Sequence, residues 1–65
     1  MEKISFKDLE EKMGGELTIA IDVNGKEVIY KQKLVGMDPE FLIFQEDDKK
    51  HYVSKYGVKR IISYN

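Results

Sequence analysis

The chain has 65 residues, of which 42% are hydrophobic, and it contains one proline, one histidine and neither cysteine nor tryptophan. This length fits a single small domain. Without cysteine there is no disulfide and no cysteine-ligated zinc, and one histidine leaves no nucleophile paired with a base. We therefore expect no enzyme, no metal site and no cofactor. The 11 basic residues nearly balance the 12 acidic ones, which argues against a general nucleic-acid binder.

Hydropathy predicts the cellular location of the chain, and its size predicts its oligomeric state. The longest unbroken apolar run has four residues, 41–44, and residues 1–3 lead into a charged stretch. We therefore expect no membrane span, no signal peptide and a cytoplasmic location. A domain of this size buries only about 60% of its unfolded surface, and such domains often gain stability by oligomerising. The expected form is a homo-oligomer.

A helix is predicted near the start of the chain, over about 5–13. Ser5 is a typical helix N-cap, and Asp8 stands at the third helical position, where a carboxylate complements exposed N–H groups. Ile4 and Leu9 have the spacing of a hydrophobic staple across this cap. An apolar stripe follows with helical spacing, and two glycines then end the helix. The stripe and the glycines are Phe6, Leu9, Met13, Gly14 and Gly15.

Two strands joined by a tight turn are predicted over 16–23 and 26–36. Branched aliphatic residues occupy every odd position from 17 to 23, which is the period of a strand buried on one face. Asn24-Gly25 favours a two-residue hairpin turn, because both residues accept positive φ angles. This turn fixes a register in which apolar residues meet on one face. The expected cross-strand pairs are Ile21 with Val28 and Ile19 with Tyr30.

Three more strands are predicted in the second half of the chain. Gly36 interrupts the second strand, as glycine does at a bulge or sharp bend, and residues 37–40 form a turn. Residues 41–44 are apolar on both faces, which suits a central strand that lies between the core and the helix. The charged residues 46–50 are predicted to form a hairpin loop. The three strands span about 41–46, 50–55 and 59–64.

A short N-terminal helix followed by five antiparallel strands predicts a mostly β fold. The glycine bend in the second strand and the break before the fifth are typical of a small barrel of the Sm-like or SH3-like kind. No internal repeat or linker is visible, so this single domain is expected to span 1–65. Its fourth and fifth strands would have open edges, which either are protected or pair with another chain.

Charge is unevenly distributed along the chain. Residues 1–25 hold three lysines and six acidic residues, whereas residues 49–65 hold five basic residues and no acidic one. Tyrosines and the histidine are interleaved with these cations. Single-stranded nucleic acid is bound by such combinations, because cations follow the phosphates while rings stack on bases at about 1–3 kcal/mol each. The candidate RNA-binding residues are His51, Tyr52, Lys55, Tyr56, Lys59 and Arg60.

The same segment also has a purely structural interpretation. Tyrosines on a barrel are often half-buried, and lysines on exposed strand faces simply interact with water. His51 is then an ordinary residue at the edge of a loop. The acidic run 46–48 lacks the spaced ligands and the glycine of a calcium loop, so it indicates a solvated hairpin tip.

Three segments resemble the Sm-like superfamily and, within it, the Hfq family of bacterial RNA chaperones. Residues 18–25 are similar to the first strand and the Val-Asn-Gly turn of that family. Residues 34–38, followed by 41–44, are similar to the Sm1 pattern, in which Leu-x-Gly-Phe-Asp precedes an apolar third strand. Residues 53–61 align without gaps with the family segment Val-Tyr-Lys-His-Ala-Ile-Ser-Thr-Ile.

This resemblance implies a ring that closes by pairing of edge strands and that binds RNA. Tyr56 stands where the family has histidine, and Leu42 lies near the position of its uridine-binding asparagine, so uridine recognition is not implied. The leading hypothesis is a homo-oligomeric Sm-like barrel that binds single-stranded RNA. In it, Lys55, Lys59 and Arg60 neutralise phosphates and Tyr56 stacks on a base. The alternative is a small SH3-like protein-interaction module, a regulator or inhibitor of a larger protein, that uses its acidic helix or an open sheet edge.

Overall fold

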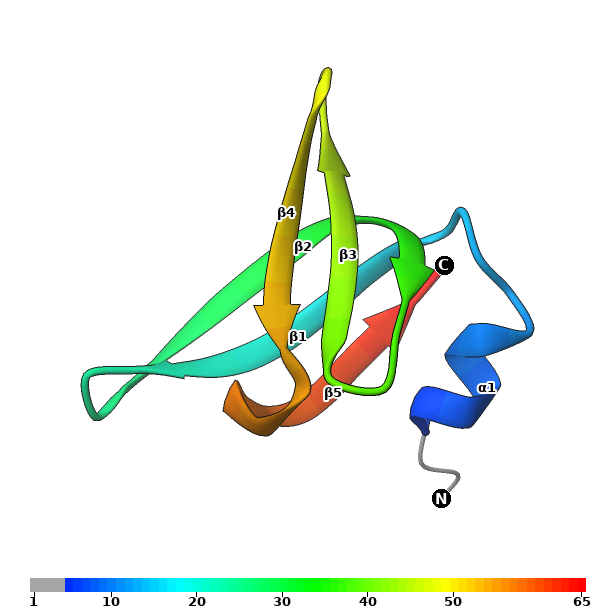
Figure 1. The fold of residues 1–65 in the computed structure, drawn as a ribbon. Coiled ribbons are helices and arrows are strands. Elements are labelled where there is room, and N and C mark those ends of the chain that lie inside the picture. The colour runs from blue at the N-terminus through cyan, green and yellow to red at the C-terminus, as the bar shows by residue number, and fades with distance from the viewer. Residues whose placement is uncertain (1–4) are drawn as a thin grey trace.

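The computed structural model describes residues 5–65, which form one short α-helix and five antiparallel strands in one sheet (Figure 1). The predicted mostly β fold with a short N-terminal helix is therefore confirmed. The elements are α1 (Phe6–Glu10), β1 (Glu16–Val23), β2 (Lys26–Met37), β3 (Phe41–Glu46), β4 (Lys49–Ser54), the 3-10 turn η1 (Lys55–Gly57) and β5 (Val58–Tyr64). Over this part of the chain, no helix is long and apolar enough to cross a membrane.

The sheet has the strand order β4-β3-β2-β1-β5, so β4 and β5 are its two edges. β2 is shared between two neighbours, because residues 26–33 pair with β1 and residues from 33 to 37 pair with β3. In Figure 1 the β3–β4 hairpin accordingly runs across the direction of β1 and β5. No strand pairing joins β4 to β5 within the described residues. The sheet is therefore open, and a closed barrel stays a prediction.

The β1–β2 hairpin has the turn and register that its sequence predicts. Asn24 and Gly25 both have positive φ angles, 52° and 82°. Val23 pairs with Lys26, and the pairing continues along both strands without a bulge. Both expected apolar pairs, Ile21 with Val28 and Ile19 with Tyr30, are present.

The predicted interruption of β2 at Gly36 is a β-bulge. Leu34 pairs with Phe44 and Gly36 with Ile43, so Val35 is the extra residue on β2. The side chain of Ile43 lies over the glycine, since a Cβ atom on Gly36 would be 3.2 Å from its Cδ1. The bulge bends β2 between the part that pairs with β1 and the part that pairs with β3.

The core lies on the inner face of this bent sheet. Tyr30 packs edge-on against Phe44 at its margin, with ring centroids 5.0 Å apart. The helix contributes Leu9 to the core, so α1 covers the inner face of β3. The expectation that α1 covers the other, outer face of β3 is wrong. The fully buried core side chains are Leu9, Leu17, Ile19, Leu34, Leu42 and Phe44.

The helix begins as predicted but ends earlier. Ser5 Oγ accepts a hydrogen bond from the N–H of Asp8 (3.3 Å), and the N–H of Ser5 donates to the Asp8 carboxylate (3.2 Å). The helix stops at Glu10, three residues short of the predicted end, and Met13 is exposed. The chain leaves the helix to join the sheet, where the N–H of Gly14 donates to the carbonyl of Leu34 (2.8 Å). The predicted staple includes Ile4, which lies outside the described residues.

The later strands lie within one residue of their predicted bounds. β4 begins at 49 and ends at 54, and β5 begins at 58. The predicted charged loop over 46–50 is a turn of only two residues, Asp47 and Asp48, because Glu46 already pairs with Lys49. The β3–β4 hairpin is therefore tighter than its charge pattern suggested.

The C-terminal end of β5 contacts the segment just before β1. The N–H of Gly15 donates to the hydroxyl of Tyr64 (3.0 Å), and Glu16 and Asn65 exchange two backbone hydrogen bonds of 2.9 and 3.0 Å. A Cβ atom on Gly15 would lie 2.5 Å from the carbonyl oxygen of Asn65 and 2.8 Å from the Tyr64 ring. Only glycine fits this contact without a shift of the backbone.

We predict that Gly15→Ala lowers the free energy of unfolding by about 1–3 kcal/mol, because the added methyl group overlaps backbone and ring atoms. Urea denaturation followed by circular dichroism measures this change. The matched control is Gly57→Ala, since nothing lies within 4 Å of a Cβ atom there, and we expect a change within about 0.5 kcal/mol. Equal effects of the two substitutions would contradict the tight contact at Gly15.

Candidate nucleic-acid interface

The six predicted RNA-binding residues lie on three consecutive elements, and His51 leaves the sheet face opposite to that of Tyr52. Two lie on β4, two in the turn η1 and two on β5. β4 and β5 are opposite edges in the strand order, but η1 joins them directly, so Lys59 follows Tyr56 by only three residues. The residues are His51 and Tyr52 on β4, Lys55 and Tyr56 in η1, and Lys59 and Arg60 on β5.

Tyr52 and Tyr56 are the most exposed large hydrophobic side chains of the described chain. Tyr56 is 89% exposed and Tyr52 is 61% exposed. The hydroxyl of Ser54 accepts a hydrogen bond from the N–H of Tyr56 (3.2 Å), which fixes the turn that presents this ring. Tyr52 packs edge-on against Phe41, with centroids 6.3 Å apart and an interplanar angle of 80°. Both rings are therefore largely exposed to solvent, and Tyr52 also contacts Phe41.

Lysines lie near both tyrosines along the chain, on β4 and in η1. Lys50 precedes Tyr52 by two residues on β4, so both side chains leave the same face of the sheet. The ammonium of Lys55 lies 5.3 Å from the centroid of the Phe6 ring, a cation–π contact. Within residues 5–65, no carboxylate lies within ion-pairing distance of Lys49, Lys50 or Lys55. Their charge is available to an anionic ligand.

Arg60 is already engaged by the protein. Its guanidinium nitrogens lie 3.2 and 3.3 Å from the two carboxylate oxygens of Glu27 on β2. This two-pronged pairing uses the geometry with which arginine would bind a phosphate. Lys59 is exposed beside it, as the extra residue of a bulge in β5. The β5 pair therefore supplies one available cation rather than two.

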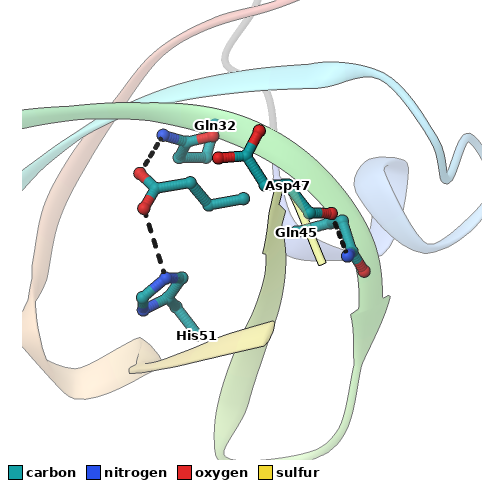
Figure 2. Close-up of polar contacts among 5 residues, drawn as sticks. Gln32, Gln45, Asp47 and His51 are labelled. Carbon is teal, nitrogen blue, oxygen red and sulfur yellow. Dashed lines mark hydrogen bonds and ion pairs between the residues drawn. The ribbon is translucent and has the colours of Figure 1, made fainter. Parts of the chain in front are cut away.

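His51 belongs to a polar cluster on the inner side of the sheet (Figure 2). Its Nε2 atom lies 3.6 Å from one carboxylate oxygen of Glu46, and the amide of Gln32 donates to the other oxygen at 2.9 Å. His51 also pairs with the buried Phe44, so it leaves the face opposite to that of Tyr52. The contacts of His51 therefore connect β4 to β3 and, through Gln32, to β2. His51 does not lie on the same face of the sheet as Tyr52.

Lys50 is the cation that the choice of candidates from sequence left out. It lies on the same face of β4 as Tyr52, while His51 lies on the other. The alternation of side chains along a strand contains this information, since residues 50 and 52 share a face and residue 51 does not. A choice based on the charge of the whole segment does not separate the two faces.

In the described chain, no group of three or more His, Asp or Glu side chains could hold a metal ion.

The inner cluster affects the ionisation of Tyr30. Burial raises the pKa of Tyr30 above its ordinary value of 10.0, and the negative charge of Glu46 raises it further. As the pH rises, the unfolded chain therefore loses this proton before the folded chain does. The corresponding stabilisation is complete below about pH 10 and is lost as the pH increases beyond that value.

We predict that Tyr30→Phe makes the free energy of unfolding less sensitive to pH above about pH 10. Urea denaturation at a series of alkaline pH values measures the slope. The matched control is Tyr56→Phe, which removes a hydroxyl from a side chain that is 89% exposed. The same alkaline slope for Tyr30→Phe and the wild type would show that Tyr30 does not contribute.

The chain was compared with known proteins in three ways. No model of a protein family, no curated protein and no solved structure matches it. The resemblance of three segments to the Sm-like superfamily therefore stays a prediction from sequence. The residues of β4 and η1, with their exposed rings and available cations, are the basis for a functional assignment.

Proposed function

We propose that this chain binds single-stranded RNA through β4 and η1, at one edge of its sheet. The observation that supports this proposal is the combination of two exposed tyrosines with lysines that have no carboxylate partner in the described chain. Exposed rings stack on bases without regard to sequence, and neighbouring cations follow the phosphates. The proposed interface consists of Lys50, Tyr52, Lys55 and Tyr56.

The proposal narrows the set of residues chosen from sequence. Arg60 is paired with Glu27, and His51 lies 3.6 Å from Glu46 on the sheet face opposite to that of Tyr52, so neither is assigned to phosphate binding. Lys59 is exposed and follows Tyr56 by three residues, so it stays a candidate at the margin of the interface. A net charge of −1 for the whole chain suits a local interface better than general attraction to nucleic acid.

The proposed assembly is a homo-oligomeric Sm-like barrel. Two unpaired edge strands in a 65-residue chain support it, because β4 of one copy could pair with β5 of the next and so continue the sheet. Both edges also carry features that discourage pairing. β4 begins with two lysines, and β5 has two register shifts against β1. A strand that pairs with either edge must therefore accommodate the lysine charges or the bulges.

We predict that Tyr56→Ala weakens binding of short single-stranded oligoribonucleotides by about 1–3 kcal/mol through loss of stacking. Lys50→Gln and Lys55→Gln should each lower the slope of log affinity against log salt concentration by about 0.7. Fluorescence anisotropy of labelled adenine and uracil oligomers at several salt concentrations measures both effects.

The matched control is Lys12→Gln, which makes the same charge change at an exposed position far from β4 in the sequence. Its affinity and salt slope should equal those of the wild type. If all lysine variants lose affinity equally, attraction is general and β4–η1 is not the interface. If the wild-type chain shows no salt-dependent affinity for either oligomer, the proposed function is wrong.

We predict that the purified, nuclease-treated chain has the mass of a ring of several copies, because edge pairing would complete the sheet of each copy. Light scattering after size exclusion measures this mass. A hexamer or heptamer would support the Sm-like assembly. A monomer or dimer would contradict the ring.

A protein-interaction module is the second candidate, and the open edges of the sheet are the observation that favours it. An extended segment of a larger protein could add a strand to either edge. A monomeric chain that binds neither oligoribonucleotide but captures one protein partner, with or without nuclease treatment, would favour this regulator or inhibitor role.

A further inference from the structure

The outer face of β3 is partly exposed to solvent in the described structure. Phe41, Ile43 and Gln45 alternate with the buried Leu42 and Phe44, so they leave the opposite side of the sheet. This side would normally be covered in a central strand, but α1 packs on the inner face. Phe41 and Ile43 therefore remain partly exposed to solvent.

The strand register places cations on both sides of this apolar strip. Lys33 on β2 pairs with Gln45, and Gln45 pairs with Lys50 on β4, so these three side chains form one row across the sheet. The next row contains Gly36, Ile43 and Tyr52. Because Gly36 has no side chain, the ring of Tyr52 and the aliphatic chain of Ile43 are not hidden from the β2 side.

The remaining polar group of this surface is also fixed. The amide nitrogen of Gln45 donates to the backbone carbonyl of Asp47 at 2.6 Å (Figure 2). Its amide oxygen is therefore the end left to accept a hydrogen bond from a ligand. The surface thus consists of apolar and aromatic side chains, one hydrogen-bond acceptor from Gln45, and one lysine on each side.

From this arrangement we infer that the outer face of β2, β3 and β4 is a platform on which a single RNA strand lies flat. Bases stack on Tyr52 and on the strip formed by Phe41 and Ile43, and Lys33 and Lys50 contact the phosphates on either side. This inference rests on the proposed function and extends the interface from the edge of the sheet onto its face. The platform consists of Lys33, Phe41, Ile43, Gln45, Lys50 and Tyr52.

Charge favours a nucleic acid over a second copy of the chain as the occupant. The platform carries two lysines and no acidic residue, whereas an isologous contact between two copies would place these lysines against each other. Glu16 on the neighbouring β1 is the cross-strand partner of Lys33, and its carboxylate lies 3.5 Å from Lys31. Acidic side chains at both ends of β3 limit the platform to a short stretch of RNA. They are Asp38 and Glu40 at one end and Asp47 and Asp48 at the other.

Lys33 provides the sharpest test, because it lies on β2 and outside the basic C-terminal segment. We expect Lys33→Gln to lower the slope of log affinity against log salt by about 0.7 for labelled adenine and uracil oligomers. The matched control is Lys26→Gln, the same change at an exposed position of the same strand, at the far end of the β1–β2 hairpin. Tyr52→Ala should weaken binding by at least about five-fold.

A direct readout complements the variants. Addition of the unlabelled oligomer should shift the amide resonances of Gly36 and Ile43, which lie in the middle of the platform, and leave that of Gly25 in the distal turn unchanged. Thermal unfolding of each variant identifies any loss of affinity that follows from loss of structure. Lys33→Gln replaces an exposed side chain, so its result stands even if Tyr52→Ala is destabilised.

The outcomes separate this inference from the proposed function. If Tyr56→Ala and Lys55→Gln reduce affinity but Lys33→Gln equals Lys26→Gln and the Gly36 resonance is unmoved, RNA binds only at the edge and the platform is wrong. If the wild-type chain binds neither oligomer, both proposals are wrong. If Tyr52→Ala lowers the mass in solution and leaves RNA affinity unchanged, the face contacts a second copy of the chain instead.

Discussion

The bulge at Val35 in β2 is the feature on which the rest of the fold depends. A five-stranded sheet has an apolar face that must be covered, and a helix of five residues is too small to cover it. The bend in β2 folds the sheet over its own apolar face. Leu17 and Ile19 come from the strand that pairs with β2 before the bulge, and Leu42 and Phe44 come from the strand that pairs with it afterwards. All four belong to one buried cluster.

The bend also determines which surfaces remain for function. Because the two halves of the sheet enclose the inner face and α1 covers part of the same face, the outer face of β3 stays partly exposed to solvent. Lys50 and Tyr52 leave this outer face, whereas Arg60 pairs with Glu27 and His51 leaves the opposite face beside Glu46. The distribution of binding groups therefore follows from how the sheet folds over its own core.

The parts of the structure that are determined by residues close together in the sequence could be predicted from the sequence. Alternating aliphatic residues and Asn24-Gly25 predict β1, β2 and their register, because the turn and the pattern demand the same pairing. The length of α1 was not predictable in this way, since Gly14 leaves the helix to donate a hydrogen bond to Leu34, twenty residues away in the sequence. The loss of Arg60 as a candidate has the same origin. Its partner Glu27 is separated from it by 33 residues, and a count of charges along the chain contains no sign of this pair.

The pairing of β1 with β5 has a consequence for how the chain folds. β1 is the first strand in the sequence and β5 is the last, yet they are neighbours and exchange hydrogen bonds as far as Glu16 and Asn65. The meander β1-β2-β3-β4 can form from hairpins that each close a short loop, whereas docking of β5 closes a loop of about forty residues and costs more chain entropy. Before that step, β1 has one open edge and Ile19 and Ile21 lack the neighbours that β5 supplies. The pairing of β5 therefore covers the open edge of the first strand, and a chain in which β5 has not docked exposes that edge to pairing with another chain.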